Sequence, residues 1–108
     1  MTVRELAQKL GARAVCEPEP DRQVCGCYTG DLLSWVMGRA QADNVWVTIM
    51  TNINTVAVAT LADVSCVVIA EGAELDEAAA KTAEAKGVNV YSSPLSSYSL
   101  CAAISDLI

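Results

Sequence analysis

The chain has 108 residues, a length typical of one domain, and 53% of them are hydrophobic, so it can bury a real core. Its net charge is -6, and its seven Lys and Arg residues are scattered rather than gathered in a run. This distribution argues against a nucleic-acid partner, because phosphate neutralisation needs clustered basic residues. We therefore expect one domain over residues 1–108.

The chain is expected to begin with a helix, a short strand and a loop. Thr2 and Glu5 form a capping-box pattern ahead of apolar residues at helical spacing, and Gly11 ends this helix. A short strand is expected over residues 14–16. The two prolines within residues 17–20 then require an extended, exposed loop.

A second strand is expected over residues 23–28, followed by the turn 29–31 and an amphipathic helix. Asp31 is expected to be the N-cap of that helix, since a carboxylate suits the positive end of the helix dipole. Its apolar face comprises Leu32, Leu33, Val36, Met37 and Ala40. We expect Trp35 to lie in the core or at an interface between two copies.

The second half of the chain predicts three strands and three helices. The segment 51–65 contains Val and Thr that would suit a strand, but a parallel crossover needs about this length, so we favour a helix capped by Asn54. A helix over 74–86 ends at Gly87. The strands are expected over 44–50, 66–70 and 89–92, and the last helix over 96–107.

Strands and helices in this order predict an α/β three-layer sandwich, with a mostly parallel sheet of about five strands flanked by helices. Ligands in such sheets lie beyond the carboxyl ends of the strands. The candidate ligand-binding residues at those ends are Tyr28, Thr29, Gly30, Asp31, Thr51, Asn52, Asn54, Glu71, Gly72 and Ser92. We expect them to line one rim of the sheet.

Structural roles explain several of these residues equally well. Asp31 and Asn54 suit helix caps, Gly30 suits a tight turn, and residues 71–72 suit an exposed turn. A phosphate group can bind the free N–H groups at a helix start, although Asp31 would oppose an anion there. Thr51 and Asn52 follow a buried strand directly, where polar side chains usually need a partner.

No catalytic set is recognisable in the chain. It has no His, no phosphate-binding P-loop, no dinucleotide fingerprint and no nucleophile elbow. A nucleophile activated by His is therefore excluded within one chain. We expect a protein that is not an enzyme and that holds no cofactor or metal. The alternative is a small enzyme using Asp31 and Glu71 as acid and base.

The five cysteines, an odd number without a signal peptide, favour reduced thiols in the cytoplasm. No apolar run reaches the ~18 residues that a membrane span needs. Cys25 and Cys27 form the one close pair, and in a strand they would share a face about 7 Å apart. We expect both to be small core residues rather than disulfide partners or metal ligands. Arg22 beside Asp21 is expected to be a local surface pair.

The string Asp21-Arg22-x-Val24-x-Gly26, followed by Thr29-Gly30-Asp31-Leu32-Leu33, resembles the signature of the DRTGG domain family. Thr51-x-x-Asn54 and Ala70-Glu71-Gly72 agree with that pattern, and the likeness covers essentially the whole chain. Gln23 to Gly26 depart from the string that gives the family its name. The resemblance implies an α/β accessory domain, as in the amino-terminal part of HPr kinase/phosphorylase, long phosphate acetyltransferases and CBS-containing pyrophosphatases.

Together these features predict a non-enzymatic, cytoplasmic regulatory or small-ligand-binding module that forms a homodimer. The expected ligand is a small polar or phosphorylated metabolite held by the loops at 29–31 and 51–54. The alternative is an interaction domain that docks on a separate metabolic enzyme.

Overall fold

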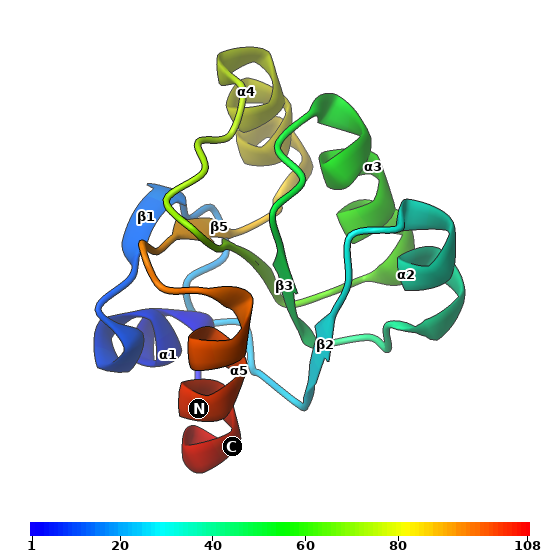
Figure 1. Cartoon of the computed structure of the whole chain (residues 1–108). Coiled ribbons are helices and arrows are strands. Elements are labelled where there is room, and N and C mark those ends of the chain that lie inside the picture. Colours follow the sequence, from blue (N-terminus) through cyan, green and yellow to red (C-terminus); the bar gives the residue numbers. More distant parts are fainter.

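The computed structural model describes every residue from Met1 to Ile108 and contains five helices and five strands. Along the chain these elements are α1 (Val3–Leu10), β1 (Arg13–Cys16), β2 (Cys27–Thr29), α2 (Leu33–Arg39), β3 (Val45–Thr48), α3 (Ile53–Ala62), β4 (Cys66–Ile69), α4 (Glu77–Lys86), β5 (Val90–Ser92) and α5 (Ser97–Leu107). All five strands form one sheet, which lies between two layers of helices (Figure 1). The predicted α/β sandwich is therefore confirmed.

The sheet has the strand order β1-β5-β4-β3-β2. Strands β2 to β5 run parallel to one another, whereas β1 pairs with β5 in the antiparallel direction, so the sheet is mixed. The reversed direction of β1 follows from its connections. The end of β1 lies beside the start of β5, at the end of the sheet where the parallel strands begin. The loop from β1 to β2 therefore stays at that end and runs to the far edge of the sheet, without the crossover that a parallel pair needs.

Each face of the sheet has its own apolar core. Helices α2, α3 and α4 cover one face, and α1 and α5 cover the other (Figure 1). Trp46 faces the first layer, while its neighbours Val45 and Val47 face the second, as the alternation of a strand requires. Strands β3 and β4 are buried throughout, which explains their continuous apolar sequences.

The helix predicted between β3 and β4 is confirmed, but its cap differs from the expectation. Asn52 rather than Asn54 is the N-cap: its backbone is extended, and its side-chain oxygen accepts a hydrogen bond from the Asn54 N–H at 2.9 Å. The helix then ends at Asp63 in a left-handed conformation. Asn54 lies one position inside the first turn, where it cannot cap.

The second strand is shorter than the sequence pattern suggests. The structure places β2 at Cys27–Thr29, and Gln23 forms only an isolated bridge to Thr2. Gly26 separates the two segments, because its φ of +76° is a left-handed conformation that interrupts regular strand pairing. Helix α4 also begins later than expected, at Glu77, and the N–H of its N-cap residue Asp76 donates to the Thr51 carbonyl.

Arg22 does not form the expected pair with Asp21. Its guanidinium donates to Asp43 Oδ1 at 2.9 Å, to Asp63 Oδ1 at 2.8 Å and to the Asp63 carbonyl at 2.6 Å. Asp43 and Asp63 both have left-handed backbones in the turns that precede β3 and β4. Arg22 therefore ties the loop ahead of β2 to two turns at the amino ends of the parallel strands.

Candidate functional site

The loops that follow the four parallel strands all open at the same edge of the sheet, which we call the rim. Backbone hydrogen bonds join neighbouring loops there: the Ala70 N–H donates to the Thr48 carbonyl, and the Ser93 N–H to the Ile69 carbonyl. This arrangement follows from the parallel direction of β2 to β5.

Asp31 links two loops of the rim instead of capping α2. Its Oδ1 accepts hydrogen bonds from the Thr48 hydroxyl at 2.8 Å and from the Ile49 N–H at 3.0 Å. The N-cap position belongs to Leu32, which makes no side-chain cap. The expected capping role of Asp31 is therefore wrong, because a buried hydroxyl on the neighbouring strand competes for the same oxygen.

The turn after β2 is shaped by contacts with β3. The Thr29 hydroxyl donates to the Val47 carbonyl at 3.2 Å, and the Gly30 carbonyl accepts from Trp46 Nε1 at 2.9 Å. A Cβ atom at Gly30 would lie 3.1 Å from the ring of Tyr28, so the absence of a side chain at Gly30 leaves room for this ring. Tyr28 is half-buried and packs against the core on the face that α2, α3 and α4 cover.

The loop between β3 and α3 presents polar side chains at the rim. Asn52 is occupied as the cap of α3, whereas the side chains of Thr51 and Asn54 make no hydrogen bond within the chain. Asn54 is exposed and Thr51 is half-buried.

Glu71, Gly72 and Ser92 belong to the other half of the rim. The Glu71 and Gly72 N–H groups donate to the carbonyls of Leu95 and Ser93, at 2.8 and 2.9 Å, and both residues have left-handed backbones. Ser92 ends β5 and pairs with Ile69 on β4. Residues 71–72 form the exposed turn that the sequence permits.

The strand order sets the spacing of the predicted rim residues. Strands β2 and β5 are separated by two other strands, which places their ends roughly 14 Å apart. Residues 28–31 therefore lie apart from Ser92, whereas the loop 51–54 lies between the loops after β2 and β4, and the Asp76 N–H donates to the Thr51 carbonyl at 3.0 Å. Asp31 and Glu71 follow strands about 10 Å apart, and Asp31 is already hydrogen-bonded, so the geometry does not favour an acid–base pair.

The rim is acidic. Asp31 and Glu71 are joined there by three further carboxylates in the segment that leads into α4: Glu74, Asp76 and Glu77. Arg13, the first residue of β1, is a basic residue at this edge, where it pairs with Ser92 at the end of β5. An anion would be repelled at most of the rim, whereas donors such as hydroxyl and amino groups would be attracted.

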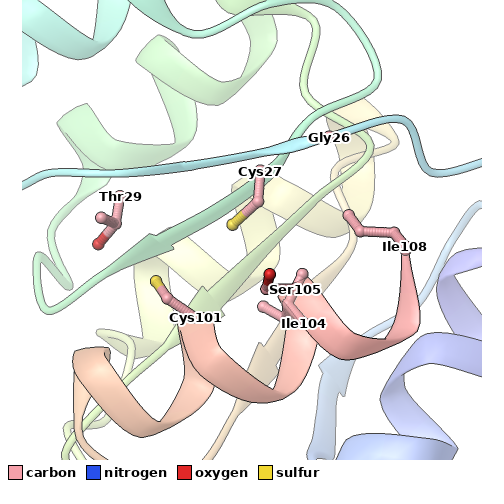
Figure 2. Close-up of a pocket in the computed structure, with 7 residues that line it drawn as sticks. All are labelled: Gly26, Cys27, Thr29, Cys101, Ile104, Ser105 and Ile108. Atoms are coloured by element: carbon pink, nitrogen blue, oxygen red, sulfur yellow. The ribbon is translucent and has the colours of Figure 1, made fainter.

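One cavity lies away from the rim, between the edge strand β2 and helix α5 (Figure 2). Its volume is about 400 Å³, and it is lined by Gly26, Cys27, Thr29, Cys101, Ile104, Ser105 and Ile108. Of the predicted site residues only Thr29 reaches it. One wall of the cavity is a face of β2, which carries Cys27 and Thr29 two residues apart. The other wall is a face of α5, which carries residues at helical spacing: Cys101, Ile104 and Ile108.

Cys25 and Cys27 are both exposed residues, so the expectation that they belong to the core is wrong. They precede and begin an edge strand, which has no neighbour to cover its outer side. The Cys27 thiol nevertheless points into the cavity (Figure 2). Burial there, together with the neighbouring Cys101 thiol, raises the pKa of Cys27 to about 12.

Trp35 is not a core residue either. Its side chain is 54% exposed, and the guanidinium of Arg39 stacks 3.6 Å from the ring centroid. Within α2 only Val36 is buried, while Leu32 and Met37 of the expected apolar face are exposed. The first turn of α2 thus presents apolar surface to the outside.

Two other kinds of site are absent from the structure. No group of three or more His, Cys, Asp or Glu residues is arranged to hold a metal ion. No helix combines the length and the apolar character needed to cross a membrane.

The chain has the fold of a DRTGG-like α/β domain, as the sequence resemblance implies. The chain is similar to a crystal structure of the CBS and DRTGG domains of the regulatory region of Clostridium perfringens pyrophosphatase, complexed with the activator diadenosine tetraphosphate. The TM-score is 0.73 at 14% identity, and the match covers 95% of this chain but 45% of the other. This likeness is one of fold. No family model matches the chain, and no curated protein matches it.

Proposed function

We propose that this chain is a regulatory, small-ligand-binding module without an enzymatic activity of its own. The observation that carries the proposal is its fold, which is similar to that of a regulatory region crystallised with a nucleotide activator. The absence of His and of any recognisable catalytic motif supports the same conclusion. Five free cysteines suit a cytoplasmic setting, where thiols stay reduced.

The ligand site in this proposal is the half of the rim formed by the loops after β2 and β3. Thr51 and Asn54 offer hydroxyl and amide groups that have no partner within the chain. The carboxylates nearby favour a ligand that donates hydrogen bonds. We propose a small polar metabolite such as a nucleoside; a phosphorylated form would direct its phosphates away from Asp31.

A thermal-shift measurement on the full chain tests this site with adenosine, ATP and diadenosine tetraphosphate as probes. A probe at about 100 times its Kd stabilises the fold by about 2.7 kcal/mol, which raises the melting temperature by roughly 10 °C. Asn54→Ala should abolish the rise, whereas Ser92→Ala, on the other half of the rim, should retain it. An unchanged melting temperature with all three probes contradicts nucleoside binding.

We also propose that a second copy of the chain covers the exposed apolar side chains beside this half of the rim. Leu32, Trp35, Ile49 and Ile53 are 58%, 54%, 44% and 48% exposed. They belong to segments that are neighbours in space, because Asp31 bonds to the Ile49 N–H and α2 lies beside α3 (Figure 1). Apolar side chains gathered in this way are typical of protein interfaces.

Light scattering measures the mass in solution and tests the dimer. The wild type should have twice the mass of one chain, and Trp35→Ala should shift it towards a single chain. Leu61→Ala is the matched control, because Leu61 is also exposed but lies near the opposite end of α3. A monomeric wild type contradicts the homodimer and favours the second candidate, a domain that docks through this surface on a separate metabolic enzyme.

A further inference from the structure

Two cysteines from distant parts of the sequence meet at the cavity between β2 and α5. Cys27 begins the edge strand and Cys101 lies in the second turn of the last helix. Both line the cavity, and their sulfur atoms point into it (Figure 2). Neither residue is closed off from solvent, since Cys27 is exposed and Cys101 is half-buried.

The strand register explains why this thiol pair stands apart from the other cysteines. Cys27, Val45 and Cys66 form one row across the sheet, on the face that α5 covers. Cys66 is sealed in the interior, and Cys25 does not line the cavity. Only the member of the row at the edge of the sheet, Cys27, is both next to α5 and open to solvent.

We propose that Cys27 and Cys101 form a reversible disulfide across this cavity, with a peroxide as the oxidant. Reversible disulfides of this kind serve as redox sensors in reducing compartments. The link would join the edge strand to α5 and close the cavity between them. This inference stands independently of the ligand and dimer proposals.

The chemistry balances with hydrogen peroxide. The Cys101 thiolate attacks one peroxide oxygen and the O–O bond breaks, which gives a sulfenic acid on Cys101 and a hydroxide that takes up a proton to become water. The Cys27 sulfur then attacks the Cys101 sulfur, the S–O bond breaks, and water leaves with the Cys27 proton. Two thiols and one peroxide yield one disulfide and two waters, and two electrons pass from sulfur to oxygen.

The environment of the pair assigns the order of these steps. Because burial and the Cys101 thiol raise the pKa of Cys27 to about 12, Cys27 stays protonated at neutral pH. A protonated thiol is a poor nucleophile towards peroxide, so in this proposal Cys101 is oxidised first. Cys27 gives up its proton only as its sulfur bonds to the electrophilic sulfur of the sulfenic acid. A dithiol reductant reverses the link by thiol–disulfide exchange.

Peptide mapping of the oxidised full chain tests the proposal. The reduced protein is treated with hydrogen peroxide, its remaining thiols are alkylated, and it is digested with trypsin. Cleavage after Arg22, Arg39 and Lys86 releases residues 23–39 and 87–108, which contain Cys27 and Cys101. These two peptides should be joined by a bond that dithiothreitol breaks, and the intact chain should lose the mass of two hydrogen atoms.

Cys25 lies in the same tryptic peptide as Cys27, so single variants distinguish them. Cys25→Ser, the matched control, should keep the cross-link, and Cys27→Ser and Cys101→Ser should each abolish it. The melting temperature of the oxidised wild type should exceed that of the reduced protein by more than about 10 °C, since the bridge closes a long loop. Circular dichroism checks that each variant is folded.

Three outcomes would overturn the proposal. One is a cross-link that persists in Cys27→Ser, which would assign it to Cys25. Another is an oxidised product in which disulfides join only separate chains. The third is a wild type in which peroxide converts Cys101 to a sulfinic acid while Cys27 remains free. If Cys27→Ser does not fold, Cys101→Ser and the Cys25→Ser control still decide between these results.

Discussion

Replacing Asp31 with alanine tests whether its carboxylate holds two rim loops together. Oδ1 accepts hydrogen bonds from the buried Thr48 hydroxyl and from the Ile49 N–H. A hydrogen bond to a charged group contributes about 1.5–3 kcal/mol, and the partial exposure of this site lowers that value. We expect Asp31→Ala to reduce the free energy of unfolding by about 2 kcal/mol, about 1 kcal/mol for each of the two bonds. Asp31→Asn keeps an acceptor oxygen and should lose about 1 kcal/mol.

Urea unfolding followed by the fluorescence of buried Trp46 measures both losses, and a double-mutant cycle with Thr48→Val isolates the link. If Asp31 acts through Thr48, the double variant should lose about 1 kcal/mol less than the sum of the single variants. Additive losses, or an Asp31→Ala variant with the wild-type urea midpoint, would refute this reasoning.

Three further stability predictions follow from buried or strained positions. Gly26→Ala should lower the free energy of unfolding by about 2 kcal/mol or more, because φ is +76° and a Cβ would lie 2.9 Å from the amide nitrogen of Asn44. In the same urea titration Gly38→Ala, in the interior of helix α2, should raise it by about 0.5–1 kcal/mol. The Tyr91 hydroxyl lowers the pKa of Glu17, so Glu17 stabilises the fold above the ordinary glutamate pKa of about 4.3, and this stability is lost as pH falls through the lowered pKa of the folded state. Tyr91→Phe should flatten this acid limb of a plot of melting temperature against pH, and an unchanged limb would contradict the assignment. Thr55→Val should raise the free energy of unfolding by about 1 kcal/mol, and with it the urea midpoint, because the Thr55 hydroxyl is buried without a hydrogen-bond partner.

Most elements could be predicted from the sequence because their signals are local. Gly11 and Gly87 end α1 and α4 in left-handed conformations, and Thr2 with Glu5 forms the capping box that begins α1. The ambiguous segment between β3 and β4 was resolved as a helix by the length that a parallel crossover needs. Local patterns of this kind carry their information within a few residues.

The side-chain partners could not be predicted in the same way, because they lie far apart along the chain. Arg22 bonds to Asp43 and Asp63, which are 21 and 41 residues away, and no local pattern favours them over the adjacent Asp21. The cavity depends on how α5 crosses β2, about 70 residues earlier in the chain. Cys27 and Cys101 are therefore neighbours only through the folding of the whole sheet.

The uninterrupted order of β2, β3, β4 and β5 has a consequence for binding at the rim. A deep crevice opens in a parallel sheet where the connections of adjacent strands depart to opposite faces. Here the connections after β2, β3 and β4 cross on one face, whereas β5 leads to α5 on the other, so the connections part between β4 and β5. The proposed ligand lies at the ends of β2 and β3, away from that parting, so a second surface is needed to enclose it there. Ligand affinity and association with a partner would then rise together, each strengthening the other by the same factor.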